Sequence, residues 1–195
     1  MITIARLEHY DEVERCERLP IAYKLWGTKK DIKAYGQMGY VENQELVVKM
    51  TAEEENPIAT YEKEEDPVYL DSALEVFFSF DIENTYYINL EVNAKGAFLC
   101  HYGKRKDRGP ILTKERVLVT ANIEEKQWSV LLRIPYSLIV KCFGNVQFHK
   151  GSRISFNLYK ICELQGEQHF ISYTFIPTKS PDFHQPAYFA EGILG

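Results

Sequence analysis

The chain has 195 residues, a size at which one domain can bury a hydrophobic core without a disulfide or a metal ion. Hydrophobic residues make up 45% of it and aromatic residues 13%, which excludes a disordered chain. The formal net charge of -5 disfavours a nucleic-acid-binding protein, which normally has a basic face. No hydrophobic stretch approaches the ~20 residues of a membrane helix. Residues 1–10 show no secretory signal, so we expect no membrane partner and a cytoplasmic location.

Short strands dominate the chain. Strands are predicted at residues 20–26, 32–41, 45–51, 73–80, 86–93, 97–102, 115–121, 127–134, 153–160, 169–176 and 187–194. Residues 52–66 are acidic and read as a loop, and the one predicted helix, residues 135–143, has proline at its start and glycine after its end. The sequence therefore predicts an all-β fold, an antiparallel, jelly-roll-like β-sandwich with one short helix, formed by residues 1–195 as a single domain.

Alternation along these strands separates a hydrophobic side from a polar side. In residues 73–80, for example, Leu74 and Val76 point one way, and Glu75 and Phe77 the other. The polar sides of the strands carry Glu75, Tyr87, Asn89, Glu91, Asn93, Arg133, Arg153, Asn157 and Tyr159. Amides, carboxylates and guanidinium groups can bind sugar hydroxyls, and aromatic rings can stack on a sugar ring. A binding face and a merely hydrated face both remain open, although asparagine is a poor strand former.

Two charged segments and the cysteines offer weaker signals. The basic cluster Lys104, Arg105, Lys106 and Arg108 could hold a phosphate or a sugar acid, but a hydrated hairpin loop is the preferred interpretation. The acidic residues 53–55 and 62–66 could hold calcium, but they lack EF-hand spacing, so a hydrated loop is again preferred. The four cysteines form no C-x-x-C pair and are expected to be free thiols.

Three segments carry a family resemblance. They are residues 67–78 (PVYLDSALEVFF), residues 86–96 (YYINLEVNAKG), and residues 156–160 (FNLYK) followed by 172–173 (SY) and 180–189 (SPDFHQPAYF). With these motifs in order, the chain resembles the carbohydrate-binding family 9-like proteins, relatives of the family 9 carbohydrate-binding modules of xylanases. The resemblance implies a β-sandwich that binds a sugar, often at the reducing end of a glucan or xylan chain, through two aromatic side chains and a ring of polar groups. It also implies calcium in some relatives.

The chain departs from the family pattern at its aromatic positions. Tyr173 stands where the family has tryptophan, and Tyr69 and Tyr61 are the candidate stacking rings near the first motif. Lys160 falls on the hydrophobic side of its strand and must snorkel or line a cleft, and His184 could either brace the C-terminal segment or bind the ligand. The predicted ligand-binding residues are Tyr69, Glu75, Asn89, Glu91, Asn157, Lys160, Tyr173 and His184.

The predicted function is non-catalytic binding of a mono- or oligosaccharide, with no cofactor required and calcium as an option. One alternative is a glycan-active enzyme with paired carboxylates such as Glu75 and Glu91. Another is a β-sandwich that binds a protein partner and no sugar. No G-x-S-x-G motif and no metal-ligand spacing is present, which favours binding over catalysis and predicts no catalytic residue. The sequence does not define the sugar or the oligomeric state.

Overall fold

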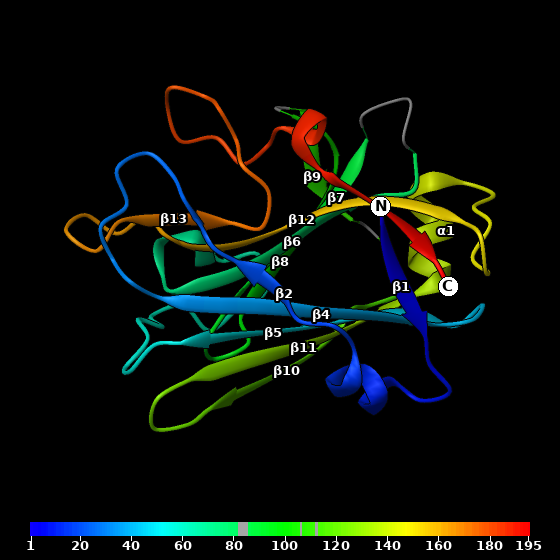
Figure 1. Ribbon diagram of the computed structural model, residues 1–195, viewed down its shortest axis with the longest axis horizontal. Helices are drawn as coiled ribbons and strands as arrows, with labels where there is room; N and C mark the ends of the chain where they lie inside the picture. Colours follow the sequence, from blue (N-terminus) through cyan, green and yellow to red (C-terminus); the bar gives the residue numbers. More distant parts are fainter. Residues whose placement is uncertain (82–85, 106, 112) are drawn as a thin grey trace.

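Two β-sheets pack face to face in the computed structural model, which describes residues 1–81, 86–105, 107–111 and 113–195 (Figure 1). We call them the β4 sheet and the β6 sheet. Strand β1 (Ile2–Arg6) joins them, because it pairs in parallel both with β4 and with β14. All other strand pairs among the described residues are antiparallel, so the predicted sandwich is confirmed and its description as purely antiparallel is a simplification.

The β4 sheet runs in the order β10, β11, β5, β4, with β2 also pairing with β4. Its strands are β2 (Leu19–Ile21), β4 (Lys33–Val41), β5 (Glu45–Glu53), β10 (Leu118–Ile123) and β11 (Trp128–Pro135). Long β4 and β5 form a hairpin around the turn at residues 42–44. Trp128 is fully buried on the inner face of β11 and belongs to the core between the sheets.

The β6 sheet runs in the order β14, β12, β6, β7, β8, β9, and β13 and β3 extend it beyond β12. Its strands are β3 (Tyr23–Lys24), β6 (Ala73–Ser79), β7 (Tyr87–Asn93), β8 (Phe98–Lys104), β9 (Asp107–Pro110), β12 (Arg153–Cys162), β13 (His169–Ser172) and β14 (Ala190–Leu194). Leu74, Val76 and Phe78 alternate along β6 and point into the core between the two sheets, as their spacing predicts.

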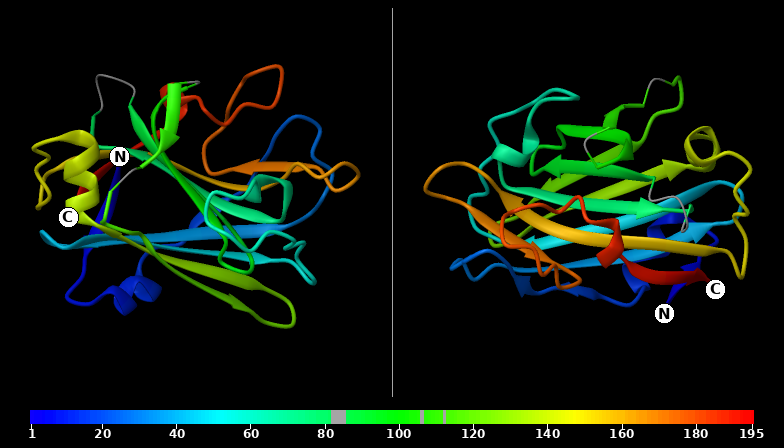
Figure 2. Two further views of the ribbon diagram at one scale, coloured as in Figure 1. Left: turned by 180° about the vertical axis from the view of Figure 1, so that it is seen from behind. Right: turned by 90° about the horizontal axis from the view of Figure 1, so that it is seen from above.

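Helices are short. Helix α1 (Tyr136–Phe143) follows β11 within one residue of its predicted position, and it lies at the same end of the molecule as both chain termini (Figure 2). The 3-10 helices are η1 (Tyr10–Arg15), which packs Val13 against β4 and β5, η2 (Val68–Leu70) and η3 (Pro186–Tyr188). No helix among the described residues is long and apolar enough to cross a membrane. All four cysteines are free, as expected.

The outer face of the β6 sheet is covered rather than hydrated. A second hydrophobic cluster lies on this face, around Phe77 of β6 and Tyr159 of β12. The residues that cover them come from outside the central strands, among them Leu25, Phe170 and Phe183. A sheet with both faces buried explains why Phe77 appears on the polar side of its strand. The polar residues Glu75 of β6 and Asn89 and Glu91 of β7 lie on this covered face.

Some predicted strands differ from the observed ones, and two strands, β1 and β9, were missed. Strand β9 lies in the basic segment that was interpreted as a hydrated hairpin loop. Residues 20–26 form two short strands, β2 and β3, which belong to different sheets, and the predicted strand 169–176 ends at Ser172. Strand β1 was not predicted, and it exists because it pairs with β4 and β14, far from it in the sequence. Such long-range pairing leaves little local signal.

Candidate functional site

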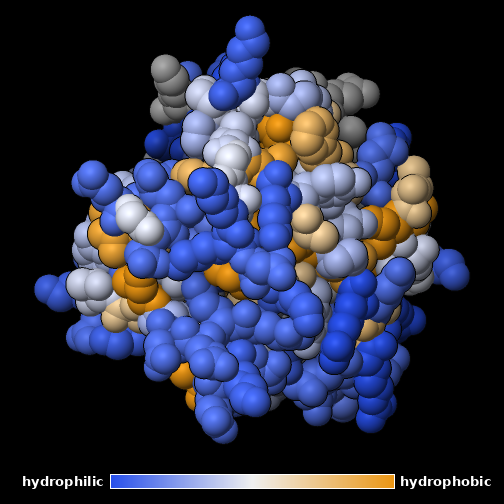
Figure 3. All heavy atoms as spheres, turned by 60° about the vertical axis from the view of Figure 1, so that its left-hand side comes forward, coloured by the Kyte–Doolittle hydropathy of each residue, from blue (hydrophilic) through white to orange (hydrophobic). Residues whose placement is uncertain are grey.

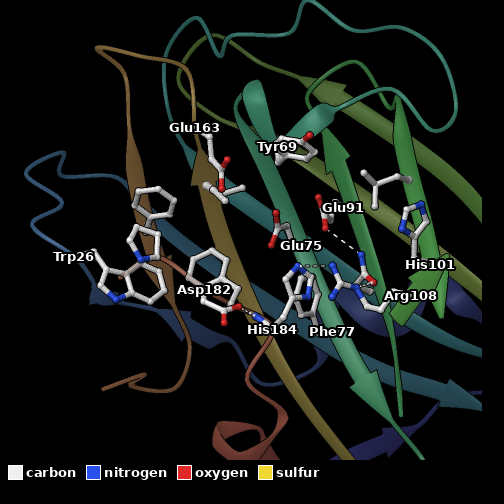
Figure 4. Close-up of a pocket in the computed structure, with 16 residues that line it drawn as sticks. Trp26, Tyr69, Glu75, Phe77, Glu91, His101, Arg108, Glu163, Asp182 and His184 are labelled. Atoms are coloured by element: carbon white, nitrogen blue, oxygen red, sulfur yellow. Dashed lines mark hydrogen bonds between the residues drawn. The ribbon is translucent and has the colours of Figure 1, made fainter. Parts of the chain in front are cut away.

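A pocket of about 380 Å³ lies on the outer face of the β6 sheet (Figure 4). Its base is formed by alternate residues of two neighbouring strands, Glu75 and Phe77 on β6 and Asn89 and Glu91 on β7. The other residues that line it are Trp26, Tyr69, Leu99, His101, Arg108, Ile161, Glu163, Phe170, Pro181, Asp182, Phe183 and His184. Several distant segments of the chain therefore enclose two strands whose polar side chains share one face.

The register of β6 against β7 sets the order of the groups at the base. Glu75 lies directly opposite Glu91, and Phe77 directly opposite Asn89. The end of β7 is tied to the start of β6, because the side-chain amide of Asn93 donates to Asp71 Oδ2 at 2.9 Å. The side-chain oxygen of Asn93 also holds the turn into β8, accepting hydrogen bonds from the backbone N–H groups of Lys95, at 3.1 Å, and Ala97, at 3.0 Å. Alternation then directs all four side chains of the base to the same face.

Arg108, on the short strand β9, connects three residues of the site. Its Nε donates to the side-chain oxygen of Asn89 at 3.1 Å, and its terminal nitrogens lie 3.4 Å from the hydroxyl of Tyr87 and 2.9 Å from Nε2 of His184. Gly103 makes the β8–β9 hairpin possible: its φ is +146°, and a Cβ there would lie 2.1 Å from the carbonyl oxygen of Asp107. The hairpin thus delivers a guanidinium group to the pocket.

His184 is neutral, and its tautomer follows from its partners. A guanidinium group can only donate, so Nε2 of His184 accepts from Arg108 and the proton resides on Nδ1, which donates to the hydroxyl of Tyr87 at 3.0 Å. Burial, together with the charge of Arg108, lowers the pKa of His184 to about 3. The ring also stacks on Phe77, with centroids 4.9 Å apart. His184 therefore closes one side of the pocket as a fixed, uncharged group.

Burial favours the protonated form of the two glutamates at the base. Glu75 is 2% exposed and Glu91 is 6% exposed. Burial raises the pKa of Glu91 to about 7, although Asn89 donates a hydrogen bond to its Oε1 at 3.0 Å, which favours the ionised form. Burial, and then the charge of Glu91, raises the pKa of Glu75 well above its usual value. Asn89 accepts a hydrogen bond from Arg108 and donates one to Glu91, so it orients the carboxyl group of Glu91 at the base of the pocket.

Aromatic rings stand at two sides of the pocket. Tyr69, in η2, is 36% exposed at its rim. The chain before it is fixed by Asp71, whose carboxylate accepts hydrogen bonds from the backbone N–H groups of Thr60, at 2.9 Å, and Tyr61, at 3.0 Å. On the opposite side Trp26 has a left-handed backbone, with φ of 49°, a conformation that is uncommon for large residues and often found at functional sites.

The structure brings five of the eight predicted ligand-binding residues together. Tyr69, Glu75, Asn89, Glu91 and His184 all line the pocket. Asn157 does not line it: the side chain is fully buried, and it donates to Thr174 Oγ1 at 2.7 Å while accepting from the backbone N–H of Thr174 at 3.1 Å. Asn157 therefore fixes the segment that follows β13, and it was placed in the predicted site because parity identifies a face but not what covers it.

Lys160 does not reach the pocket or the solvent. Its side chain is 0% exposed, with Nζ 3.2 Å from Glu54 Oε2 and 2.7 Å from His169 Nε2. It also lies 5.7 Å from the centre of the Trp128 ring, and Glu54 accepts a hydrogen bond from Trp128 Nε1 at 2.9 Å. The expectation that Lys160 snorkels or lines a cleft is wrong, because a buried carboxylate neutralises it inside the protein.

The two other predicted stacking rings lie elsewhere. Tyr173 stacks on Phe156, with centroids 5.8 Å apart, and borders a separate hollow beside Tyr23 and Phe175. Tyr61 packs against the small hydrophobic cluster around Val68. Neither lines the pocket: Tyr173 follows the end of β13 at Ser172 and packs against the core between the two sheets.

Several residues of the pocket were missed from the sequence. Arg108 belongs to the basic cluster that was interpreted as a hydrated loop, and that interpretation is wrong for Arg108; Lys106 of the same cluster lies outside the described residues. Asp182 lies within the quoted segment 180–189, so the family motif was an available signal for it. No feature of the sequence identified Trp26 and Glu163 as pocket residues, since they follow strands whose partners are distant in the sequence.

The carboxylates of the acidic segments contact other groups of the protein. Glu54 serves Lys160 and Trp128, and Glu65 lies 2.6 Å from His101 Nε2. Asp66 accepts hydrogen bonds from the backbone at residues 62 and 63. Within residues 1–81, 86–105, 107–111 and 113–195, no three His, Cys, Asp or Glu side chains are grouped so that they could hold a metal ion. These carboxylates are engaged by the protein itself.

The sequence profile of carbohydrate-binding family 9 matches residues 36–194. The chain belongs to this family. No match is found among curated proteins. The family 9 segment includes every strand from β5 to β14 and most of β4, and all residues that line the pocket except Trp26.

Solved structures share the fold of this family 9 chain at low sequence identity. A candidate carbohydrate-binding protein from Bacteroides uniformis ATCC 8492 is 19% identical, with a TM-score of 0.85 over 100% of this chain and 98% of the other. A family 9 module from Caldicellulosiruptor kristjanssonii in complex with glucose is 13% identical, with a TM-score of 0.71 over 100% and 95%. A family 9 module from the same organism in complex with cellotriose is 14% identical, with a TM-score of 0.72 over 99% and 92%.

Proposed function

We propose that the chain binds carbohydrate without cleaving it, and that the pocket on the β6 sheet is the binding site. One observation carries the proposal: fixed carboxyl, amide and guanidinium groups from β6, β7 and β9 converge at the base of a pocket with aromatic rings at its sides (Figure 4). Such groups can hydrogen-bond several hydroxyls at once, and the rings can cover the C–H face of a sugar. Membership of family 9 supports the same function.

The ligand we propose is a monosaccharide or the end of a short oligosaccharide. The volume of about 380 Å³ lies near the lower end of small-molecule sites, which span roughly 300–1,000 Å³, and favours one or two sugar units over a long chain. The glucose and cellotriose in the two Caldicellulosiruptor kristjanssonii modules are ligands of this size class. We propose the reducing end as the part that enters, in line with the family resemblance.

The arrangement of the two glutamates supports binding over hydrolysis. Glu75 and Glu91 are direct cross-strand neighbours on one sheet face, so both carboxyl groups lie on the same side of any ligand in the pocket. A glycosidase needs its two carboxyl groups to flank the glycosidic bond. On the face drawn in Figure 3, hydrophobic residues form small separate spots rather than the continuous patch that a protein partner would favour.

The test is a calorimetric titration with glucose, xylose, cellobiose, cellotriose and xylobiose, with and without EDTA. Tyr69→Ala should weaken binding about tenfold by removing a stacking ring. Tyr173→Ala is the matched control, since it removes a tyrosine ring outside the pocket. Methyl β-cellobioside and cellobiose, compared directly, test the reducing-end preference.

Saturating heat that is weakened by Tyr69→Ala and unchanged by Tyr173→Ala is the expected result. No saturable heat with any of these sugars at millimolar concentration would overturn the proposal, and so would an equal effect of the two variants. Chromatography of the cellotriose sample after the titration should show intact cellotriose, and released glucose would instead establish hydrolysis.

A further inference from the structure

Glu75 carries a buried oxygen that has no hydrogen-bond partner among the described residues. This atom is Oε2, in a side chain that is 2% exposed. A buried polar atom without a partner destabilises the protein, and more so when it is charged, so native proteins rarely keep one without a reason. Glu75 lies at the middle of the pocket beside Glu91 (Figure 4). A bound ligand with a hydrogen-bond donor would satisfy this oxygen.

The charges around this oxygen favour a cationic donor. Four carboxyl groups line the pocket, those of Glu75, Glu91, Glu163 and Asp182, against a single guanidinium group. That group, Arg108, donates to an amide, a phenol and an imidazole, and no hydrogen bond from it to a carboxylate is found among the described residues. Lys160 is a buried residue of β12 that does not line the pocket, and it is paired with Glu54. The pocket thus has more carboxyl groups than nearby cations.

The histidines do not change this balance. His184 is neutral, because burial and Arg108 lower its pKa to about 3. His101 lies 2.6 Å from Glu65, so any positive charge it takes up is matched by that carboxylate. Asp182 is engaged by the backbone N–H of His184, at 2.9 Å, by the amide of Gln185, at 2.6 Å, and by the guanidinium group of Arg105, at 3.5 Å. Glu75 and Glu91 are therefore the carboxyl groups of the pocket whose charge is least balanced by nearby cations.

The geometry of these two acids suits an ammonium group. Residues directly opposite across antiparallel strands have Cβ atoms about 4.5–5.5 Å apart, and like charges in that arrangement repel. An ammonium group has three donors and can serve both carboxylates at once with charge-assisted hydrogen bonds. A sugar hydroxyl has one donor and no charge. We propose that the pocket selects amino sugars, with the ammonium group bound between Glu75 and Glu91.

This selectivity rests on the proposed sugar-binding function and adds the class of sugar to it. The aromatic sides of the pocket contact the ring, as for any sugar, and the pair of acids distinguishes an amine from a hydroxyl. Burial favours the protonated form of both acids. An ammonium group favours the ionised form, so its binding should release protons from the pair to the buffer.

The first experiment compares affinities at about pH 6, where the amine is protonated. The ligands are glucose, its 2-amino, 3-amino and 6-amino analogues, and N-acetylglucosamine. Three amine positions are used because any of the three could lie over the acids. We expect at least one amino sugar to bind tenfold or more tightly than glucose, and N-acetylglucosamine, which has the same skeleton without the charge, to show no such gain.

Variants locate the ammonium group. Glu75→Gln and Glu91→Gln keep the size of the side chain and remove its charge, so each should bring the ratio of amino-sugar to glucose affinity close to one. Glu53→Gln, which removes an exposed carboxylate outside the pocket, should leave the ratio unchanged. Titration of the unmodified protein in two buffers of different ionisation enthalpy gives a second readout, and amino-sugar binding should release more protons than glucose binding.

The outcomes separate the two proposals. If glucose binds and no amino sugar binds more tightly, the amino-sugar inference is overturned and sugar binding stands. If an amino sugar is preferred but the preference survives in both glutamine variants, the ammonium group lies elsewhere and the inference is likewise wrong. If none of the sugars binds, both proposals fall.

Discussion

Glu75 of β6 and Glu91 of β7 lie directly opposite each other in the β6 sheet, and both side chains are buried at the base of the pocket. Two carboxylates in such positions do not ionise independently, because burial and mutual repulsion both favour the protonated form. A sheet selected only for stability would have two hydrophobic side chains, or two side chains of opposite charge, at these facing positions. The pair therefore destabilises the ligand-free protein, and a ligand that bonds to both carboxyl groups can remove this destabilisation.

The first prediction concerns the stability of the ligand-free protein. Glu91→Gln should raise the free energy of unfolding at about pH 8 by roughly 1–3 kcal/mol, and by less at about pH 5. The folded pKa of Glu91 is raised from 4.5 to about 7, so between these values the folded state holds more protons than the unfolded state, and stability falls as pH rises. Glutamine does not titrate and can still accept from Asn89.

Urea unfolding of both proteins across this pH range gives the difference directly. The low pKa values of His169 and His184, about 4 and about 3, have the opposite effect on stability, because they remove it as pH falls below about 6.5. The comparison between variant and parent cancels that contribution. A difference that stays constant across the range would show that Glu91 does not hold a proton in the folded state.

The second prediction concerns Arg108. Arg108→Met should lower sugar affinity about tenfold, because Asn89 and His184 lose the group that orients them. It should also raise the pKa values of Glu75 and Glu91 further, since the charge of Arg108 lowers both. Carboxyl NMR titration of the ligand-free protein measures this shift. Lys104→Met, in the same hairpin and exposed, is the control and should change neither quantity.

Most of the sandwich was predictable from the sequence because its strands alternate. Alternation in β6 and β7 identified Glu75, Asn89 and Glu91 as one row, and that row forms the base of the pocket. Parity could not show that the same face is covered by residues such as Phe183. For that reason Asn157, which lies on the predicted face, is a buried structural residue rather than a pocket residue.

Residues whose role depends on partners from other parts of the chain were the hardest to predict. Arg108 looked like one of several hydrated basic residues, and only the tight β8–β9 hairpin directs it inward. Lys160 was correctly placed on the hydrophobic side of β12, but its partner Glu54 comes from a loop more than a hundred residues earlier. Pairings of this kind depend on tertiary packing, which one sequence does not reveal.

The third prediction concerns that buried ion pair. Lys160→Met should destabilise the protein by about 3–5 kcal/mol, because Glu54 would remain as a buried charge without its cation. The double variant with Glu54→Gln should recover much of the loss, since neither charge is left. Urea unfolding of the single and double variants closes a double-mutant cycle. Equal losses in Lys160→Met and in the double variant would mean that packing of the lysine stem, not charge, dominates.

The fourth prediction separates the two roles of Trp26. Its ring packs edge-on against Phe170, with centroids 5.5 Å apart, and its Nε1 donates to the carbonyl oxygen of Thr178 at 2.8 Å. Trp26→Phe keeps an aromatic ring but removes the hydrogen bond that tethers the segment leading to Asp182 and His184. Because a single hydrogen bond is worth about 0.5–1.5 kcal/mol, global stability should change little.

Sugar affinity of Trp26→Phe should fall several-fold, and amide hydrogen exchange at residues 181–184 should become faster, because the loosened segment positions one side of the pocket. Tyr188→Phe, a change of similar size outside the pocket lining, is the control for both measurements. Weaker binding with unchanged exchange at residues 181–184 would assign the effect of Trp26 to contact with the sugar ring. Faster exchange with unchanged affinity would show that this segment does not position groups for the ligand.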